Sequence, residues 1–89
     1  MDENDNTVTL AKPIEGTDKK KIEKITLRKP SPGELRGVQL GMLGAGEVSM
    51  LTKVISRIST PHLTEAQVSG MDLGDFTECY VKIQGFLGN

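Results

Sequence analysis

The sequence has few large side chains from which to build a core. Its 89 residues contain no Trp, one Tyr and two Phe, so aliphatic residues and four Met must fill the interior. A chain of this length buries only a modest share of its surface, which makes such a core marginal. We therefore expect a single small domain over residues 7–89, to which a partner or a second copy of the chain adds stability.

Cysteine and histidine are equally scarce. Cys79 is the single Cys, which excludes an internal disulfide and a Cys-based metal site and is compatible with a reducing compartment. Apart from Lys82, no base or cation lies in the adjacent turn, so we interpret Cys79 as a small core residue and not a nucleophile. His62, the only His, lies in a predicted loop without a second ligand nearby. The sequence thus predicts no catalytic, cofactor or metal site, and no enzyme.

Long apolar runs and a strong net charge are also absent. No apolar stretch approaches the roughly 20 residues that span a bilayer, and the acidic start of the chain has no apolar segment typical of a signal peptide. Residues 1–6 have no apolar residue after Met1, which predicts a flexible tail. The formal net charge is −1, which gives the whole chain no electrostatic attraction to nucleic acid. These features favour a cytoplasmic protein.

The segment from Ile22 to Leu43 contains the main change of pattern. Before it, apolar and polar residues alternate, which predicts a β-hairpin over residues 7–28. Pairing Val8 with Leu27 and Leu10 with Ile25 puts four apolar side chains on one face. The same register places Lys12 opposite Glu23 and Glu15 opposite Lys20, and leaves residues 16–19 as a four-residue loop.

Beyond the hairpin the pattern is helical over residues 31–87. Ser31, Pro32 and Glu34 have the spacing of a capping box, so a helix should begin there and end near Gly41. A glycine-rich connector over residues 42–46 and a second helix over residues 46–58 follow. A capping box at Thr64 predicts a short helix, and Asp72 is the expected cap of the last helix. The fold class is therefore α+β, with an N-terminal β-hairpin followed by three to four short helices.

Two of these helices carry apolar residues at helical spacing. On the second helix they are Val48, Leu51, Ile55 and Ile58; on the last they are Leu73, Phe76, Tyr80, Ile83 and Leu87. Since both stripes need cover, we expect Phe76, Tyr80 and Ile83 to pack against Val48, Leu51 and Ile55.

Three flexible apolar residues lie beside glycines and are candidates for contact with a partner. Met42, Leu43 and Met50 have the adaptable character of promiscuous binding surfaces. The alternative is that all three simply fill the core, and the sequence alone does not separate the two.

Basic residues in and after the hairpin suggest a second function, a small nucleic-acid-binding module. They are Lys19, Lys20, Lys21, Lys24, Arg28, Lys29 and Arg36. The simpler interpretation is a solvated hairpin tip whose charges protect an edge strand, since Glu15, Asp18 and Glu23 cancel most of the local field.

Four stretches together resemble the small tail assembly chaperones of contractile-tailed bacteriophages. They are the strand end ITLRKP, the helix start SPGELRGVQL, the middle helix VSMLTKVISRIS and the ending LTEAQVSGMDLGDFTECYVKIQGFL. The resemblance covers about residues 7–87, and the turn LTEAQV before MDLGDF is its most characteristic part.

The resemblance implies a function. By this resemblance, we expect the chain to act on the tape-measure protein, a long aggregation-prone helical protein that sets tail length. It implies a non-catalytic chaperone of the host bacterial cytoplasm that is absent from the mature virion. It further implies, as partners, the tape-measure protein and a longer frameshifted form of the chain itself. We also expect self-association, but neither nucleic acid nor a membrane as a partner.

Overall fold

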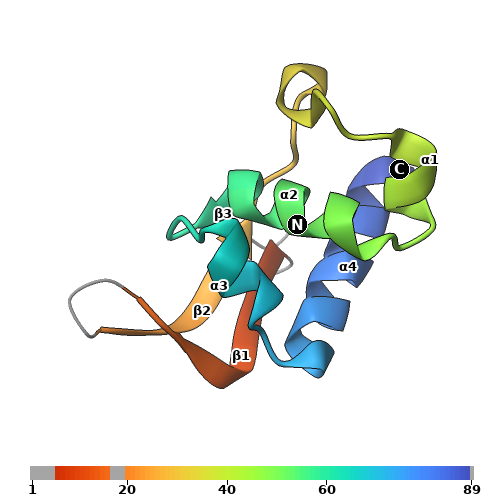
Figure 1. Cartoon of the computed structure of the whole chain (residues 1–89). Helices are drawn as coiled ribbons and strands as arrows, with labels where there is room; N and C mark the ends of the chain where they lie inside the picture. The colour runs from red at the N-terminus through yellow and green to blue at the C-terminus, as the bar shows by residue number, and fades with distance from the viewer. Residues whose placement is uncertain (1–5, 17–19, 89) are drawn as a thin grey trace.

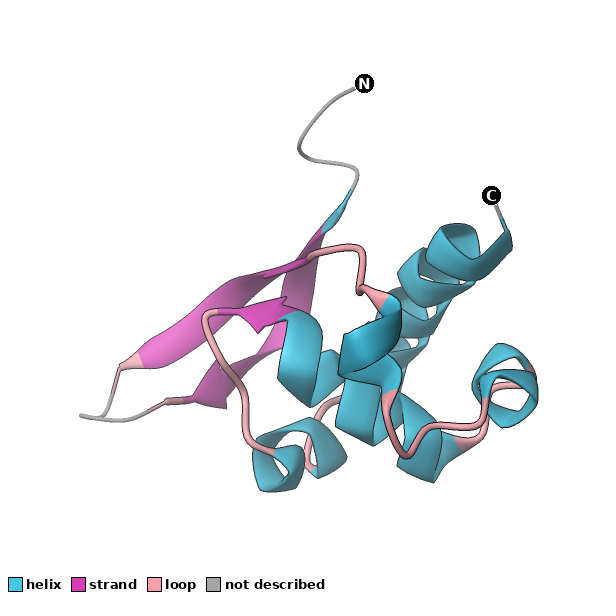
Figure 2. Ribbon diagram, turned by 90° about the horizontal axis from the view of Figure 1, so that it is seen from above, coloured by secondary structure: helices cyan, strands magenta, loops and turns pink. Residues whose placement is uncertain are grey.

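A small antiparallel sheet and a group of short helices make up the computed structural model, which describes residues 6–16 and 20–88 (Figure 1). The sheet has the order β1-β2-β3, with β1 at Thr7–Glu15, β2 at Lys21–Leu27 and β3 at Ser59–Thr60. The helical elements are η3 (Pro32–Leu35, 3₁₀), α1 (Leu40–Gly44), α2 (Val48–Ile58), α3 (Glu65–Ser69) and α4 (Leu73–Gly88). The strands lie at one side and the helices gather on the other (Figure 2). The α+β class with an N-terminal hairpin is confirmed.

The hairpin forms, but in a different register from the predicted one. Val8 pairs with Ile25, not Leu27, and Glu15 pairs with Lys21, not Lys20. The shift at Val8 is two residues, so its side chain stays on the core face. Val8, Leu10, Ile25 and Leu27, the four apolar residues of the predicted face, are buried as expected. Residues 1–5 of the predicted tail and residues 17–19 of the predicted loop lie outside the described residues.

The register changes because β1 contains an irregularity between Thr9 and Ile14. There the carboxylate of Asp75, on α4, accepts hydrogen bonds from two consecutive backbone N–H groups of β1. The distances are 2.9 Å from Ala11 N to Asp75 Oδ1 and 3.1 Å from Lys12 N to Asp75 Oδ2. Asp75 is buried, at 3% exposed. A buried carboxylate needs hydrogen-bond donors, and the bulge of β1 supplies them.

The predicted helix from Ser31 to Gly41 is broken into two pieces. The capping box forms, since Ser31 N donates to Glu34 Oε1 at 3.1 Å, but the first helix is a single 3₁₀ turn that ends at Leu35. Gly37 then has φ of 78°, a conformation that ends helices and that glycine adopts without strain. The prediction was wrong because capping signals fix where a helix begins and say little about its length.

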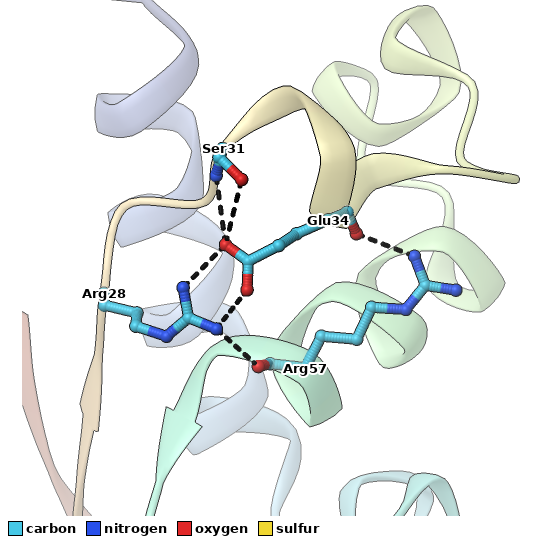
Figure 3. A network of polar contacts seen from close by, with 4 residues as sticks. All are labelled: Arg28, Ser31, Glu34 and Arg57. Carbon is cyan, nitrogen blue, oxygen red and sulfur yellow. Dashed lines mark hydrogen bonds and ion pairs between the residues drawn. The ribbon is translucent and has the colours of Figure 1, made fainter.

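A polar network holds the junction between β2 and η3 against the end of α2 (Figure 3). Arg28 donates to both carboxylate oxygens of Glu34, with 2.6 Å from Nη1 to Oε1. Arg57 donates through Nη1 to the carbonyl oxygens of Glu34 and Arg36, at 2.8 and 2.9 Å. The hydrogen bonds from Arg28 and then from the Ser31 backbone lower the pKa of Glu34 to about 2. The junction is therefore fixed by an ionised carboxylate at neutral pH.

The predicted connector over residues 42–46 is mostly helical, because α1 includes Met42, Leu43 and Gly44. The turn from α1 to α2 depends on Gly46, which has φ of 87°. A Cβ at this position would lie 3.1 Å from Cζ of Tyr80. Tyr80 also donates from its hydroxyl to the carbonyl oxygen of Gly44, at 3.0 Å. α4 thus packs on the α1–α2 turn, and a side chain at position 46 would need both a strained backbone and a small shift of the Tyr80 ring.

α2 and α4 form as predicted. Leu51, Ile55 and Ile58 of the predicted α2 stripe are buried, whereas α4 presents a partly different face to the core. Val48, Leu73 and Leu87 are 60%, 76% and 39% exposed, so these three members of the predicted stripes are not core residues. The buried line of α4 is Asp75, Cys79 and Ile83, flanked by partly buried Phe76 and Tyr80. The hydrogen bonds from β1 to Asp75 explain the different face of α4. They hold the side of the helix that carries Asp75, Cys79 and Ile83 toward the sheet. The core still joins Ile83 with Leu51 and Ile55, as predicted.

A third strand was not predicted from the sequence. Ser59 and Thr60, at the end of α2, pair with Leu27 and Thr26 of β2. Two residues carry no alternating pattern, so nothing in the sequence distinguishes this strand from a loop. The strand ends at Pro61, which has no N–H to continue the ladder.

Candidate partner-binding surface

The termini of three helices converge on an apolar groove of about 200 Å³. They are the start of α2, the end of α3 and the start of α4. The groove is lined by Val48, Thr52, Val68, Ser69, Met71, Leu73 and Phe76. Val68 is buried at its base, while Val48 and Leu73 are strongly exposed. Large apolar side chains that stay exposed beside a groove are typical of protein-binding sites.

The N-terminal caps of α2 and α4 determine the positions of the two exposed side chains of the groove, Val48 and Leu73. Glu47 caps α2 by accepting a hydrogen bond from Met50 N at 3.0 Å, so that Val48 is the first helical residue. Asp72 caps α4, because its carboxylate accepts from Gly74 N at 3.1 Å, so that Leu73 is the first helical residue there. A side chain in a first turn has no preceding turn of its own helix to pack on. Both residues therefore depend on another surface for cover.

A signal for this groove exists in the sequence, namely the position of Val48 and Leu73 at the start of their helices. Val48 and Leu73 both directly follow an acidic cap residue, which marks the first turn. Periodicity alone assigned them to the core, because it treats every turn of a helix alike.

The three predicted partner-binding residues lie in different environments. Met42 is 46% exposed on α1, next to Leu40, which is 56% exposed. Leu43 is fully buried and belongs to the core, which was the alternative interpretation for this residue. Met50 is partly buried and packs against the core. None of the three lines the groove at the start of α2 and α4, and a role of Met42, Leu43 and Met50 in binding stays a prediction.

The basic residues of the alternative function do not form one surface with free charges. Arg28 is engaged by Glu34 and also donates to the carbonyl oxygen of Arg57, at 3.3 Å. Lys20, Lys21 and Lys24 line a separate cleft along β2. Lys19 lies outside the described residues.

The described residues offer little chemistry. Among residues 6–16 and 20–88, no group of three or more His, Cys, Asp or Glu side chains is placed to hold a metal ion. Cys79 is buried in the core, and this burial, followed by the charges of Asp75 and Glu78, raises the pKa of its thiol to about 12. The thiol is thus protonated and shielded at neutral pH, as expected of a core residue.

Comparison with known proteins identifies the family. A family model described as "Phage tail assembly chaperone proteins, E, or 41 or 14" matches residues 7–88. The chain belongs to this family. The match spans every helix and strand of the fold, so the groove and the β1–α4 contact both lie within the family's common region. No solved structure matches the chain.

Two curated relatives come from Escherichia phage P2. The chain is 41% identical over 83 residues to tail assembly protein E, a match that covers 93% of this chain and 90% of the relative. It is also 41% identical over 83 residues to tail assembly protein E', of which the match covers 58%. The second relative is therefore considerably longer than this tail assembly chaperone.

No helix in the part of the chain that the structure describes combines the length and the hydropathy needed to cross a membrane.

Proposed function

We propose that this tail assembly chaperone binds apolar helical segments of a tape-measure protein and keeps them soluble until the tail tube assembles. Membership of the family supports a role in tail assembly. The observation that carries the binding site is the groove, where Val48 and Leu73 remain 60% and 76% exposed on the same apolar surface. An amphipathic helix docks into such a groove through apolar residues on one face.

The proposed role is stoichiometric binding without catalysis. The groove is lined by apolar side chains, two hydroxyl-bearing residues and no titratable group, so it favours burial of apolar surface over proton transfer. Such binding gains its free energy mainly from the apolar area removed from water, at about 25 cal/mol per Å².

The proposal includes two further points about the protein in the cell. The chaperone acts in the host bacterial cytoplasm and is left out of the finished particle. A longer form of the chain, made by frameshifting, works beside it. The match to both E and E' of phage P2 supports a longer form, because the same length of this chain aligns with a short and a long relative.

Co-expression with the tape-measure gene of the same phage tests the proposal. We expect the two proteins to co-purify and the soluble yield of the tape-measure protein to rise. The double variant Val48→Asp/Leu73→Asp should abolish both effects, because charged residues in the groove oppose burial of an apolar helix. Circular dichroism should show unchanged helical content, since both residues are exposed.

A matched control uses exposed apolar residues away from the groove. Val81 and Leu87 are 58% and 39% exposed on α4 and do not line the groove. The variant Val81→Asp/Leu87→Asp should retain binding. If this control loses binding while the groove variant keeps it, the binding face lies on the outer side of α4. If the unmodified chain neither co-purifies nor raises the soluble yield, the chaperone function itself is wrong.

A further inference from the structure

One flank of the sheet is open beside the short strand β3. β3 pairs only with Thr26 and Leu27 of β2 and ends before Pro61. Among residues 6–16 and 20–88, no strand pairs with Lys21–Lys24 of β2 on that side. The open flank of a strand presents backbone N–H and C=O groups to which another extended chain can bind.

A second wall faces this flank and turns it into a cleft. The cleft has a volume of about 540 Å³, within the range of ligand sites, and is lined by Gly16, Lys20, Lys21, Ile22, Glu23, Lys24, Pro61, His62, Thr64 and Gln67. Gln67 ties α3 to the end of β1, because its side-chain nitrogen donates to the carbonyl oxygen of Glu15 at 3.0 Å. The capping box of α3 fixes Gln67 in turn, with 2.8 Å from Thr64 N to Gln67 Oε1. Hydrogen bonds thus hold Gln67, one residue of this second wall, in place.

The charge of the cleft is positive. Lys20, Lys21 and Lys24 contribute three ammonium groups, and Glu23 is the one acidic side chain in the lining. None of the three lysines forms an ion pair with a carboxylate among the residues that the structure describes. These ammonium groups are free to pair with carboxylates of a ligand.

We propose that this cleft binds an acidic peptide segment in extended conformation, which adds to β2 as a continuation of β3. The backbone of the segment bonds to the open flank of Lys21–Lys24, and its carboxylates pair with the lysines. A peptide fits better than nucleic acid, because no Phe or Tyr lines the cleft for base stacking and the chain has a net charge of −1. The proposal does not depend on the proposed function, since the apolar groove shares no residue with this cleft.

Fluorescence anisotropy with the full chain tests the proposal. The probe is a fluorescein-labelled peptide of alternating Glu and Val, about eight residues long, which favours an extended conformation. We expect the peptide to bind. Its affinity should fall at least about fivefold when NaCl rises from about 50 to about 300 mM, since exposed charges are screened. A peptide with Lys in place of Glu should not bind. Protection of the β2 amides from hydrogen exchange, on peptide binding, should locate the site at Lys21–Lys24.

Matched charge variants distinguish binding in the cleft from nonspecific attraction of the acidic peptide to basic residues. Lys21→Glu/Lys24→Glu should weaken peptide binding at least about tenfold, because two attractive charges become repulsive. Lys29→Glu/Arg36→Glu changes the net charge equally at exposed positions outside the cleft and should leave binding within about twofold. Equal losses in both variants would overturn the proposal. It would also be overturned by tighter binding of a labelled oligothymidine of similar length, which would indicate a nucleic-acid site, or by no binding of the acidic peptide at about 1 mM.

Discussion

At the scale of single residues, Asp75 contributes more to the packing of α4 on β1 than its position near a helix start suggests. As the third residue of α4 it would ordinarily complete the cap and favour the helix dipole. Instead its carboxylate is buried and accepts hydrogen bonds from Ala11 N and Lys12 N. One side chain thereby sets both the rotation of α4 and the irregularity of β1.

Replacing Asp75 should therefore destabilise the fold strongly. Asp75→Ala leaves two backbone N–H groups of β1 without their acceptor, and each hydrogen bond to a charged group contributes about 1.5–3 kcal/mol. We expect the free energy of unfolding in urea to fall by about 2–5 kcal/mol. Glu78→Ala, an exposed acidic position on the same helix, is the control and should change it by less than about 0.5 kcal/mol. Similar values for the two variants would mean that the β1–α4 bonds contribute little.

Glu34 gives a second prediction at this scale, through pH. Its pKa is lowered to about 2 by Arg28 and the Ser31 N–H, from 4.5 for an unperturbed Glu. A carboxylate with a lowered pKa in the folded state stabilises that state above its unfolded pKa. That contribution falls away as the pH drops from about 4.5 to about 2.

Titration of the Glu34 side chain by NMR checks this directly. Arg28→Gln should move the midpoint upward toward the ordinary range for Glu, because the main hydrogen bond is lost. Lys29→Gln, which removes an exposed charge next to it in sequence, should leave the midpoint almost unchanged. A normal midpoint in the unmodified protein would show that the pair does not form in solution.

At the scale of elements, the turn between α1 and α2 depends on one glycine. Gly46 has φ of 87° and lies under Tyr80, so that a Cβ added to this residue would be only 3.1 Å from Cζ of the ring. Gly46→Ala should lower the free energy of unfolding by about 1–3 kcal/mol, from the left-handed backbone and the displaced ring together.

Gly41→Ala is the matched comparison for thermal or urea unfolding. Gly41 lies within α1, has no atom within 4 Å of an added Cβ, and has no positive φ. Alanine should be neutral there or stabilise the protein by up to about 1 kcal/mol. If Gly46→Ala were equally harmless, the clamp by Tyr80 would not constrain this turn.

The elements also show what local sequence can predict. The hairpin, the capping boxes at Ser31 and Thr64, and α2 follow from signals within a few residues, and all four form. The register of the hairpin does not follow, because it depends on Asp75, which is 64 residues from Ala11 in the sequence. The groove was missed for a related reason, since exposure of Val48 and Leu73 depends on how helix ends meet in space.

At the scale of the whole molecule, the fold separates two kinds of surface. The groove at the helix termini is apolar, whereas the cleft along β2 is lined by lysines. Two partners of different chemistry can therefore bind without competing for the same residues.

Calorimetry should distinguish binding at the two surfaces. An apolar helical peptide from the tape-measure protein should bind with a negative heat-capacity change, because apolar surface is buried. Its affinity should change by less than about twofold between about 50 and about 300 mM NaCl, since few charges take part. A strong salt dependence with no heat-capacity change would contradict docking in the apolar groove.

The contact between β1 and Asp75 also has a consequence for the timing of folding during translation. Ala11 and Asp75 are 64 residues apart, and ribosomes add about 5–20 residues per second, so Asp75 follows Ala11 by roughly 3–13 s. A hairpin forms within about 10 μs. The nascent hairpin therefore has ample time to adopt a regular pairing before its native bulge can be stabilised. The native form of the first strand can therefore be completed only after the last helix has been synthesised.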